Sequence, residues 1–345
     1  MSQRQLAIRL IGGVALGFIL LAWFISGLEW KELWGVLKQV SLGWLLVAVV
    51  LMLLDYFFQA WRWGFLLRHV DDKISIKDLW NATAVMWAFN TLLPLRAGNF
   101  LRPALIARRR GLPYTTVLFT MVAEYICDVF GILIMLLTML LFLPSSMTEQ
   151  PVIGDLQTYG IFIAIGGLAT FGVVVLLLSR QARNVVVGLL RPIPSARVQK
   201  KILDIFDQLV AGMAAVGDPL RFGQALGVTL LVWGAWLLVI LATFRAFGLQ
   251  MPFSGALFME ASLTLSMLVP QAPGFLGVFQ VITEKALSLW GASSAHGQGI
   301  ALIFWAICFV PVTIIGLIAA SREGIGLINR GRGLYEDLGG DGNSD

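Results

Sequence analysis

Charged residues, cysteines and histidines are all scarce in this sequence. Lys, Arg, Asp and Glu together make up 13% of the 345 residues, about half of the share that is usual in soluble domains. The two cysteines, Cys127 and Cys308, lie in apolar segments, and the two histidines, His69 and His296, are isolated. The sequence therefore predicts no disulfide framework, no metal site and no bound cofactor.

Long apolar runs occupy most of the chain instead. Hydrophobic residues make up 58% of the sequence, and the mean hydropathy is +0.83. Runs of about 20 apolar residues are long enough to cross a bilayer as helices. The sequence therefore predicts an all-α polytopic membrane protein. Six runs are expected to span the membrane, near residues 8–27, 42–66, 114–143, 159–179, 225–248 and 298–320.

Two further apolar stretches, 79–110 and 253–290, are expected to enter the membrane and turn back. If the first crossed completely, the arginines at 108–110 would lie outside, against the rule that basic loops stay in the cytoplasm. As a re-entrant hairpin it returns them to the cytoplasmic side. The second stretch must then enter and leave from the outside, so that the basic residues after 320 are cytoplasmic. Both termini are expected in the cytoplasm.

This order contains an inverted repeat. Helix, helix, hairpin, helix over 8–143 is followed by the same order over 159–320, starting from the opposite side. The hairpin turns share the pattern Leu-x-Pro-x-x-x-Gly, with Pro94 in the first and Pro270 in the second. Proline interrupts a helix and glycine permits a tight reversal. Broken helices that meet near the midplane are typical of transporters, and hairpins that only pack the fold are the alternative.

Charged residues gather around the first hairpin. Arg96 lies at its turn and Arg102 lies about one helical turn further on. Glu124 and Asp128, four residues apart on the next helix, share one face and are expected partners for Arg102. Because an arginine fork matches phosphate oxygens, the functional interpretation is an anion site between these groups. Structural salt bridges between helices are the alternative.

Other polar and small residues complete the predicted substrate site. Gly98 and Asn99 follow the first turn, and the second hairpin contributes the following set: Gln271, Gly274, Gly277 and Gln280.

On the 42–66 helix, Asp55 and Arg62 are seven residues apart and share a face. Arg62 is close enough to the inner boundary that its side chain is expected to reach the interface.

Residues 1–320 are expected to form a single domain that includes one large cytoplasmic loop. That loop, 180–224, is basic and contains an amphipathic pattern over 198–216, which is expected to lie on the anionic inner leaflet. Residues 321–345 are Gly-rich and charged and are expected to be disordered. Membrane topology and lipid contact account for the net charge of +5, so no nucleic-acid partner is expected.

The motifs resemble those of the lysylphosphatidylglycerol synthase transmembrane family. They are Asn90-x3-Pro94-x-Arg96-x-Gly98-x3-Arg102, Glu124-x3-Asp128 and Pro273-Gly274-x2-Gly277-Val278-Phe279. The resemblance implies a bacterial-type inner-membrane protein that moves lipids, such as aminoacyl-phospholipids or lipid-linked precursors, between leaflets. Asn99, Tyr125 and Gln280 stand where the family commonly has charged residues. The transferase domain of bifunctional relatives is not found, so lysyl transfer is not expected.

Three functions are compatible with this sequence. The leading one is a flippase for lipids with anionic or phosphate head groups, and because no GxxxxGK[ST] loop occurs, its energy would come from a gradient or a downstream sink. A membrane-embedded enzyme acting on lipid phosphates, with Glu124 and Asp128 as acid and base, is the first alternative. The second is a non-catalytic lipid-binding scaffold for a neighbouring lipid-synthesising enzyme.

Overall fold

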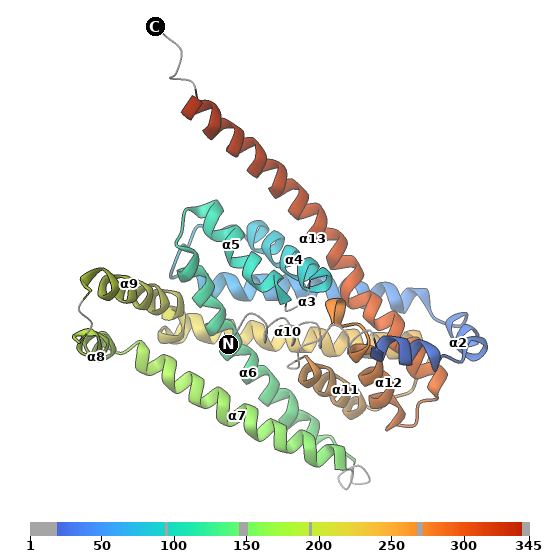
Figure 1. Ribbon diagram of the computed structural model, residues 1–345. Helices are drawn as coiled ribbons and strands as arrows, with labels where there is room; N and C mark the ends of the chain where they lie inside the picture. Colours follow the sequence, from blue (N-terminus) through green and yellow to red (C-terminus); the bar gives the residue numbers. More distant parts are fainter. Residues whose placement is uncertain (1–18, 94–95, 145–150, 193–194, 268–271, 340–345) are drawn as a thin grey trace.

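The computed structural model describes residues 19–93, 96–144, 151–192, 195–267 and 272–339 (Figure 1). Over these ranges all regular structure is helical and no strand occurs. Residues 19–26 are helical, and the α-helices that follow are α2 (Trp30–Leu37), α3 (Leu42–Leu67), α4 (Ile76–Leu92), α5 (Gly98–Arg110), α6 (Tyr114–Leu141), α7 (Pro151–Leu177), α8 (Arg180–Leu190), α9 (Ala196–Met213), α10 (Pro219–Ala246), α11 (Phe253–Ser266), α12 (Val278–Ser288) and α13 (Ser294–Gly339). Two 3₁₀ turns are η3 (Ala214–Gly217) and η4 (Pro273–Phe275).

Four of the described helices are long and apolar enough to cross a membrane. They are α3, α6, α10 and the part of α13 from Ser294 to Arg322, and they match the predicted spans 42–66, 114–143, 225–248 and 298–320. The predicted span 159–179 is the second part of α7, which bends by 83° into α8 and counts as a fifth span only if the pair is taken together. The predicted span 8–27 lies mostly outside the described residues. The prediction of an all-helical membrane protein is confirmed, and four of its six spans are recognised.

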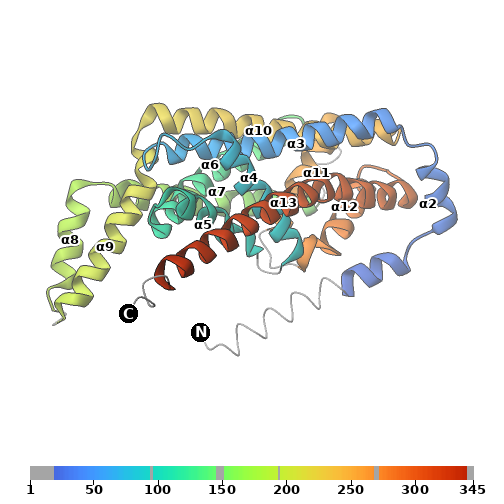
Figure 2. The same cartoon turned by 90° about the horizontal axis from the view of Figure 1, so that it is seen from above.

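Helices α3 and α10 lie side by side over most of their length in both views (Figures 1 and 2). At one end, the Ser41 N–H donates to the carbonyl of Ala246 at 2.8 Å. At the other end, His69 Nε2 lies 3.4 Å from the Asp218 carboxylate. The start of α3 therefore meets the end of α10. The corresponding helices of the two predicted repeats run in opposite directions, as an inverted repeat requires.

Helices α4 and α5 form the first hairpin. A Cβ placed on Gly98 would come within 2.0 Å of the Met86 carbonyl oxygen, so the two backbones touch near the turn. At the open end, Arg109 near the end of α5 forms an ion pair with Asp78 near the start of α4. The two limbs are therefore antiparallel. The arginines at 108–110 return to the end of the molecule from which α4 begins, as predicted.

Helices α11 and α12 form the second hairpin, which opens at the opposite end of the molecule. Its open end follows the end of α10, and there a Cβ on Gly255 would lie 3.2 Å from the Trp290 ring. Its turn contains Gly274 at φ 67° and Gly277 at φ 83°, a left-handed conformation that favours glycine. A Cβ on Gly274 would lie 3.3 Å from the carbonyl oxygen of Thr91, at the end of α4. The two turns therefore meet inside the protein.

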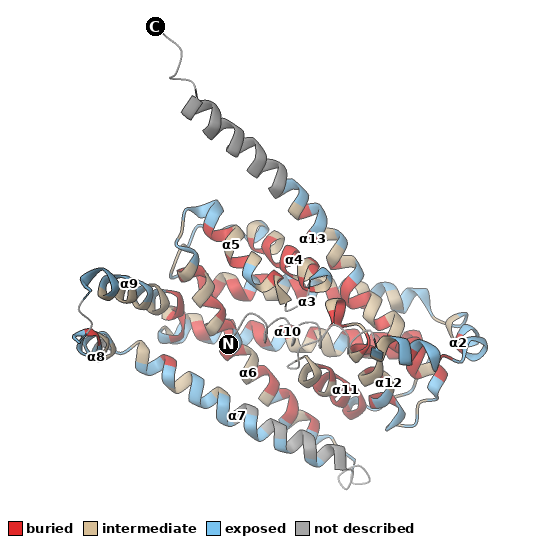
Figure 3. Cartoon of the chain, viewed as in Figure 1, coloured by how far each residue is buried: buried red, intermediate tan, exposed pale blue. Residues whose placement is uncertain are grey.

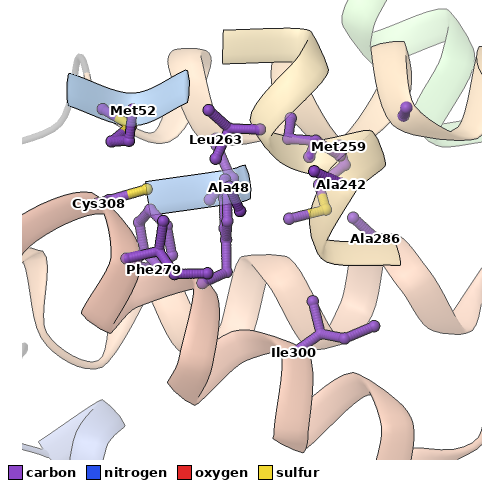
Figure 4. Close-up of a cluster of buried hydrophobic side chains, with 14 of the residues drawn as sticks. Ala48, Met52, Ala242, Met259, Leu263, Phe279, Ala286, Ile300 and Cys308 are labelled. Carbon is purple, nitrogen blue, oxygen red and sulfur yellow. The ribbon is translucent and has the colours of Figure 1, made fainter. Parts of the chain in front are cut away.

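Apolar packing fixes the second hairpin against the long helices. Figure 4 shows side chains of α3, α10, α11, α12 and α13 meeting in one cluster, among them Met52, Met259, Phe279 and Ile300. Buried residues gather where these helices cross, whereas α7, α8 and α9 carry many exposed residues (Figure 3). This cluster includes Phe275, which follows Gly274 in the second hairpin turn.

Three segments differ from the sequence expectations. The loop after residue 27 contains the short helix α2, and the basic loop 180–224 contains α8 and η3 in addition to α9. The predicted amphipathic helix 198–216 corresponds to α9 with part of η3. The predicted disordered tail differs more, since α13 continues as helix through Gly339. Extending an existing helix requires no new nucleation, which accounts for the continuation; residues 340–345 lie outside the described residues.

Candidate functional site

A cavity of about 420 Å³ lies beside the two hairpin turns. Its polar lining residues come from α3, α6, α11 and the first turn, and they are Asp55, Gln59, Arg62, Arg96, Tyr125, Asp128 and Thr264. Aromatic rings of α3, α4, α10 and α13 form much of the remaining wall, namely those of Tyr56, Trp87, Trp233, Trp236 and Phe309. The cavity therefore combines an apolar wall with a small number of charged groups, as ligand sites commonly do.

A buried network of arginines and acids lies directly behind this cavity. Arg62 Nη2 donates to Glu124 Oε1 at 3.1 Å, and Arg102 Nη1 donates to Glu124 Oε2 at 2.8 Å. Arg62 Nη1 also donates to the Asp128 carboxylate at 2.5 Å. The Arg62 and Arg102 side chains are 4% and 2% exposed, whereas that of Asp128 is 32% exposed. Glu124 therefore ties two arginines together, and Asp128 is the acid that is accessible from the cavity.

Helix α3 supplies a polar stripe to the site because its polar residues recur at helical spacing. Asp55, Gln59 and Arg62 are four and three residues apart, which places them on one face of the helix. Gln59 Nε2 donates to Asp55 Oδ2 at 2.7 Å, and Trp87 Nε1 donates to Gln59 Oε1 at 2.9 Å. The amide of Gln59 thus links the stripe to the first hairpin.

The prediction that Arg62 extends to the membrane interface is wrong. Its guanidinium is buried and is paired with Glu124 and Asp128 of α6. Two carboxylates at hydrogen-bond distance stabilise the guanidinium more than hydration at the membrane interface would. The prediction that both acids serve Arg102 holds only for Glu124, because Asp128 pairs with Arg62.

Arg102 is held in the interior without lining the cavity. In addition to Glu124, its guanidinium lies 4.0 Å from the centre of the Trp63 ring, and Nη2 donates to the carbonyl of Gln59 at 3.4 Å. The packing of a cation on an indole face is favourable when both are shielded from water. Arg102 therefore positions the first hairpin against α3 and α6.

Arg96 differs from the other two arginines because no carboxylate pairs with it among the described residues. Its φ of 52° places it in the left-handed region. Nη2 donates to the carbonyl of Met267, at the end of α11, at 2.8 Å, and the guanidinium lies 5.3 Å from the centre of the Phe275 ring. Arg96 therefore joins the two hairpin turns and lines the cavity with a cation that is not neutralised by an acid.

The remaining predicted site residues serve mainly to shape the turns. Asn99 Oδ1 accepts from Asn90 Nδ2 at 2.9 Å, between the limbs of the first hairpin. The prediction that Gln280 lines the cavity is wrong. Its Oε1 accepts from the N–H of Gly277 at 2.8 Å and caps the start of α12. Gly98, Gly274 and Gly277 allow the backbone contacts described above. Gln271 lies outside the described residues.

Several cavity residues were not assigned from the sequence. Asp55, Gln59, Tyr125 and Thr264 line the cavity, yet the sequence prediction included none of them. The polar stripe of α3 was the available signal, since a carboxylate and an amide on one face of an apolar helix are costly unless they contact other polar groups. No comparable signal marks the aromatic wall, because tryptophan is common throughout this chain.

The chemistry that these groups can perform is recognition of an anion. Both carboxylate oxygens of Glu124 accept from arginines, so this residue is poorly placed to take a proton from a substrate. In the part of the chain that the structure describes, no group of three or more His, Cys, Asp or Glu residues could hold a metal ion. Two charged groups on the cavity wall are best placed to meet a ligand. Arg96 has no acidic partner among the described residues, and the Asp128 side chain is 32% exposed.

Comparison with known proteins places this site in a family context. Residues 10–316 match the sequence model of the family described as the lysylphosphatidylglycerol synthase TM region. The chain is also similar to a protein named glycosyltransferase AglD from Haloferax volcanii, with 21% identity over 297 residues. That alignment covers 79% of this chain and 48% of the relative. The chain therefore spans about half the length of this curated relative.

Proposed function

The chain belongs to the lysylphosphatidylglycerol synthase transmembrane family, and from this premise we propose that it moves a lipid with an anionic or polar head group between the two leaflets of a membrane. The head group enters the cavity between the hairpin turns while the acyl chains remain in the surrounding lipid. Aminoacyl-phospholipids and lipid-linked precursors are the cargo classes that fit this description.

One observation supports this proposal most directly, namely the position of Arg96. It lines a cavity of about 420 Å³ at the point where both hairpin turns meet, and its contacts there are a backbone carbonyl and a phenyl ring. A cation that lacks an acidic partner at membrane depth is costly. A phosphate oxygen of a lipid head group would supply the missing negative charge through a strong, charge-assisted hydrogen bond.

Transport also requires that the hairpins re-enter the membrane rather than cross it. The open end of the first hairpin lies with the basic residues that belong in the cytoplasm, and the second hairpin opens at the opposite end. The proposed arrangement has six spans, two re-entrant hairpins and cytoplasmic termini. Residue 110 is then accessible from the cytoplasm: a cysteine there, with Cys127 and Cys308 replaced by alanine, reacts with a membrane-impermeant maleimide from inside only. Labelling from outside contradicts this topology.

Transport itself is tested with purified protein in phosphatidylcholine vesicles that contain a trace of NBD-labelled phosphatidylglycerol. Dithionite destroys the label in the outer leaflet, so further loss of fluorescence reports lipid movement. The Arg96→Gln variant should move the lipid about tenfold more slowly or worse, because a hydrogen bond between charged groups contributes about 1.5–3 kcal/mol. Lys201→Gln, in the exposed part of α9, serves as the charge-matched control and should match the wild type. Equal rates for Arg96→Gln and wild type contradict the proposal.

An enzymatic function is the competing hypothesis, and the name of the curated relative keeps it open. The pairing of Glu124 with two arginines argues against an acid–base role for it, since a general base must reach the proton that it removes. Incubation of the purified protein with the labelled lipid distinguishes the hypotheses: an enzyme changes the lipid chemically, a transporter only relocates it, and a scaffold for a lipid-synthesising partner does neither.

A further inference from the structure

Two carboxyl groups are buried in the interior without a cation beside them. Asp55 on α3 is 0% exposed and Glu260 on α11 is 1% exposed. Asp55 Oδ1 and Glu260 Oε1 are buried and have no hydrogen-bond partner. Neither residue forms an ion pair within the part of the chain that the structure describes. The anion site explained above does not require either group.

The two groups lie on different helices, and only one of them lines the cavity. Asp55 lines it directly. Glu260 precedes Thr264 by four residues and Met267 by seven, which places it on the same face of α11 as these two lining residues. Among the described residues, Asp55 is the other carboxyl group close enough to Glu260 to influence its ionisation. Asp55 therefore lies at the cavity wall, and Glu260 lies further inside, on the first helix of the second hairpin.

Among the described residues, the surroundings of both groups contain no cation that is not already paired. Leu257 and Leu263, three residues before and after Glu260 on α11, belong to the apolar cluster, and Figure 4 labels Leu263 within it. Around Asp55, the titratable or charged groups are Tyr56 and Arg62 of the same helix, Asp128 of α6 and Cys308 of α13, together with Glu260. Arg62 is the only cation among them, and both of its terminal nitrogens are occupied by Asp128, Glu124 and Thr229.

We propose that Asp55 and Glu260 form a proton-binding pair through which lipid movement is coupled to a proton gradient. The inference rests on the proposed lipid transport. A buried carboxylate without a cation costs several kcal/mol, whereas its protonated form is uncharged. Proton uptake and release at these two residues therefore changes the charge beside the lipid site.

The charge balance of the site gives the direction of the coupling. Three arginines, Arg62, Arg96 and Arg102, face the two acids Glu124 and Asp128, so the site carries one net positive charge while Asp55 and Glu260 are protonated. Release of the proton from Asp55 cancels that charge and weakens the attraction for an anionic head group. Proton and anionic lipid therefore bind together and leave together, and the protein carries both in the same direction.

A proton fits this pair better than a metal cation does. Sodium and calcium require several oxygen ligands, and the amide oxygen of Gln59 next to Asp55 already accepts from Trp87. Asp55 Oδ2 accepts from Gln59, which leaves only Oδ1 of Asp55 without a partner. A proton requires only one such oxygen.

The test uses phosphatidylcholine vesicles with a trace of NBD-labelled phosphatidylglycerol and a pH difference of one unit across the membrane. With one proton per lipid, the steady-state ratio of label between leaflets should shift up to about tenfold toward the alkaline side, since one pH unit corresponds to about 1.4 kcal/mol. Asp55→Asn and Glu260→Gln should lose this shift, whatever their rate of lipid movement. Asp204→Asn, an exposed carboxylate on α9, should retain it, and protein-free vesicles give the background.

The outcomes separate this inference from the proposed function. If the wild type moves lipid but its leaflet ratio ignores the pH difference, or shifts toward the acidic side, the coupling is refuted and transport stands. If the wild type moves no lipid even without a gradient, transport itself fails. A second measurement uses only the wild type and so does not depend on whether a variant folds. Its infrared spectrum at neutral pH should contain the carbonyl band of a protonated carboxyl group. The absence of this band refutes the protonated pair.

Discussion

The replacement of Glu124 by glutamine is the most informative test of the buried charge network. Glutamine keeps the shape of the side chain but removes the charge that faces Arg62 and Arg102. Arg62 keeps Asp128 as a partner, whereas Arg102 keeps a carbonyl at 3.4 Å, the Met86 sulfur at 3.9 Å and the Trp63 ring, none of which is charged. Loss of one partner from a buried ion pair typically costs about 3–5 kcal/mol. We expect Glu124→Gln to reduce the free energy of unfolding by about this amount.

Two comparisons give this prediction its discriminating power. Asp128→Asn should cost less, roughly 1–3 kcal/mol and at the low end of that range, because the Asp128 side chain is 32% exposed and Arg62 keeps its bond to Glu124. The double variant Arg102→Met/Glu124→Gln should recover much of the loss, since it removes the unpaired buried cation together with its partner.

Reversible unfolding of the purified protein in mixed micelles with SDS, followed by tryptophan fluorescence, measures these differences. The wild type, both single variants and the double variant are compared at one pH and ionic strength. The reasoning is refuted if Glu124→Gln is no less stable than Asp128→Asn, or if the double variant is less stable than Glu124→Gln alone.

Two smaller predictions concern the first hairpin and are measured in the same unfolding assay. Gly98→Ala should destabilise the protein by about 2 kcal/mol or more, because its Cβ would collide with the Met86 carbonyl. Gly227 has open space around it, so Gly227→Ala should not destabilise the protein. Equal effects of the two substitutions contradict the backbone contact. At the open end, the hydrogen bond from Arg110 lowers the pKa of the Asp71 carboxyl. The pair should therefore stabilise the protein slightly above the ordinary pKa of about 3.9, and this contribution should be lost as the pH falls through the lowered value. Asp71→Asn and wild type should then become equally stable in acid, and a difference that persists there contradicts the ion pair.

The arrangement of the hairpins could be predicted from the sequence because strong local signals coincide there. Proline and glycine interrupt both apolar stretches, and the arginines at 108–110 require the first stretch to turn back. The short helices α2 and α8 could not be predicted in the same way, because segments of eight and eleven residues are too short to stand out as apolar runs between the longer ones. The helical continuation of α13 past Ser321 also had no signal, since its glycines and charges are typical of loops.

The site was predicted in part for a related physical reason. Arg96 and the pairing of Glu124 with Arg102 were predicted because charged residues within apolar stretches need partners or a function. The role of Arg62 did not, because its place near the end of an apolar run allows two solutions, and only the position of α6 decides between them. Gln280 was assigned to the cavity because its type is polar, but the direction of its side chain depends on the turn at Gly277, whose φ of 83° is not specified by the sequence pattern.

The structural and functional interpretations of the charge cluster apply to different members of it. Glu124 and Arg102 are buried and do not line the cavity, so their interaction mainly ties α5 to α6. Arg96 lines the cavity and lacks an acidic partner among the described residues, so its replacement should alter lipid movement more than stability. Arg96→Gln should therefore unfold within about 1 kcal/mol of the wild type while transporting poorly, the opposite balance from Glu124→Gln. If Arg96→Gln proves as unstable as Glu124→Gln, the cation at the turn is a structural group and the anion site must lie elsewhere.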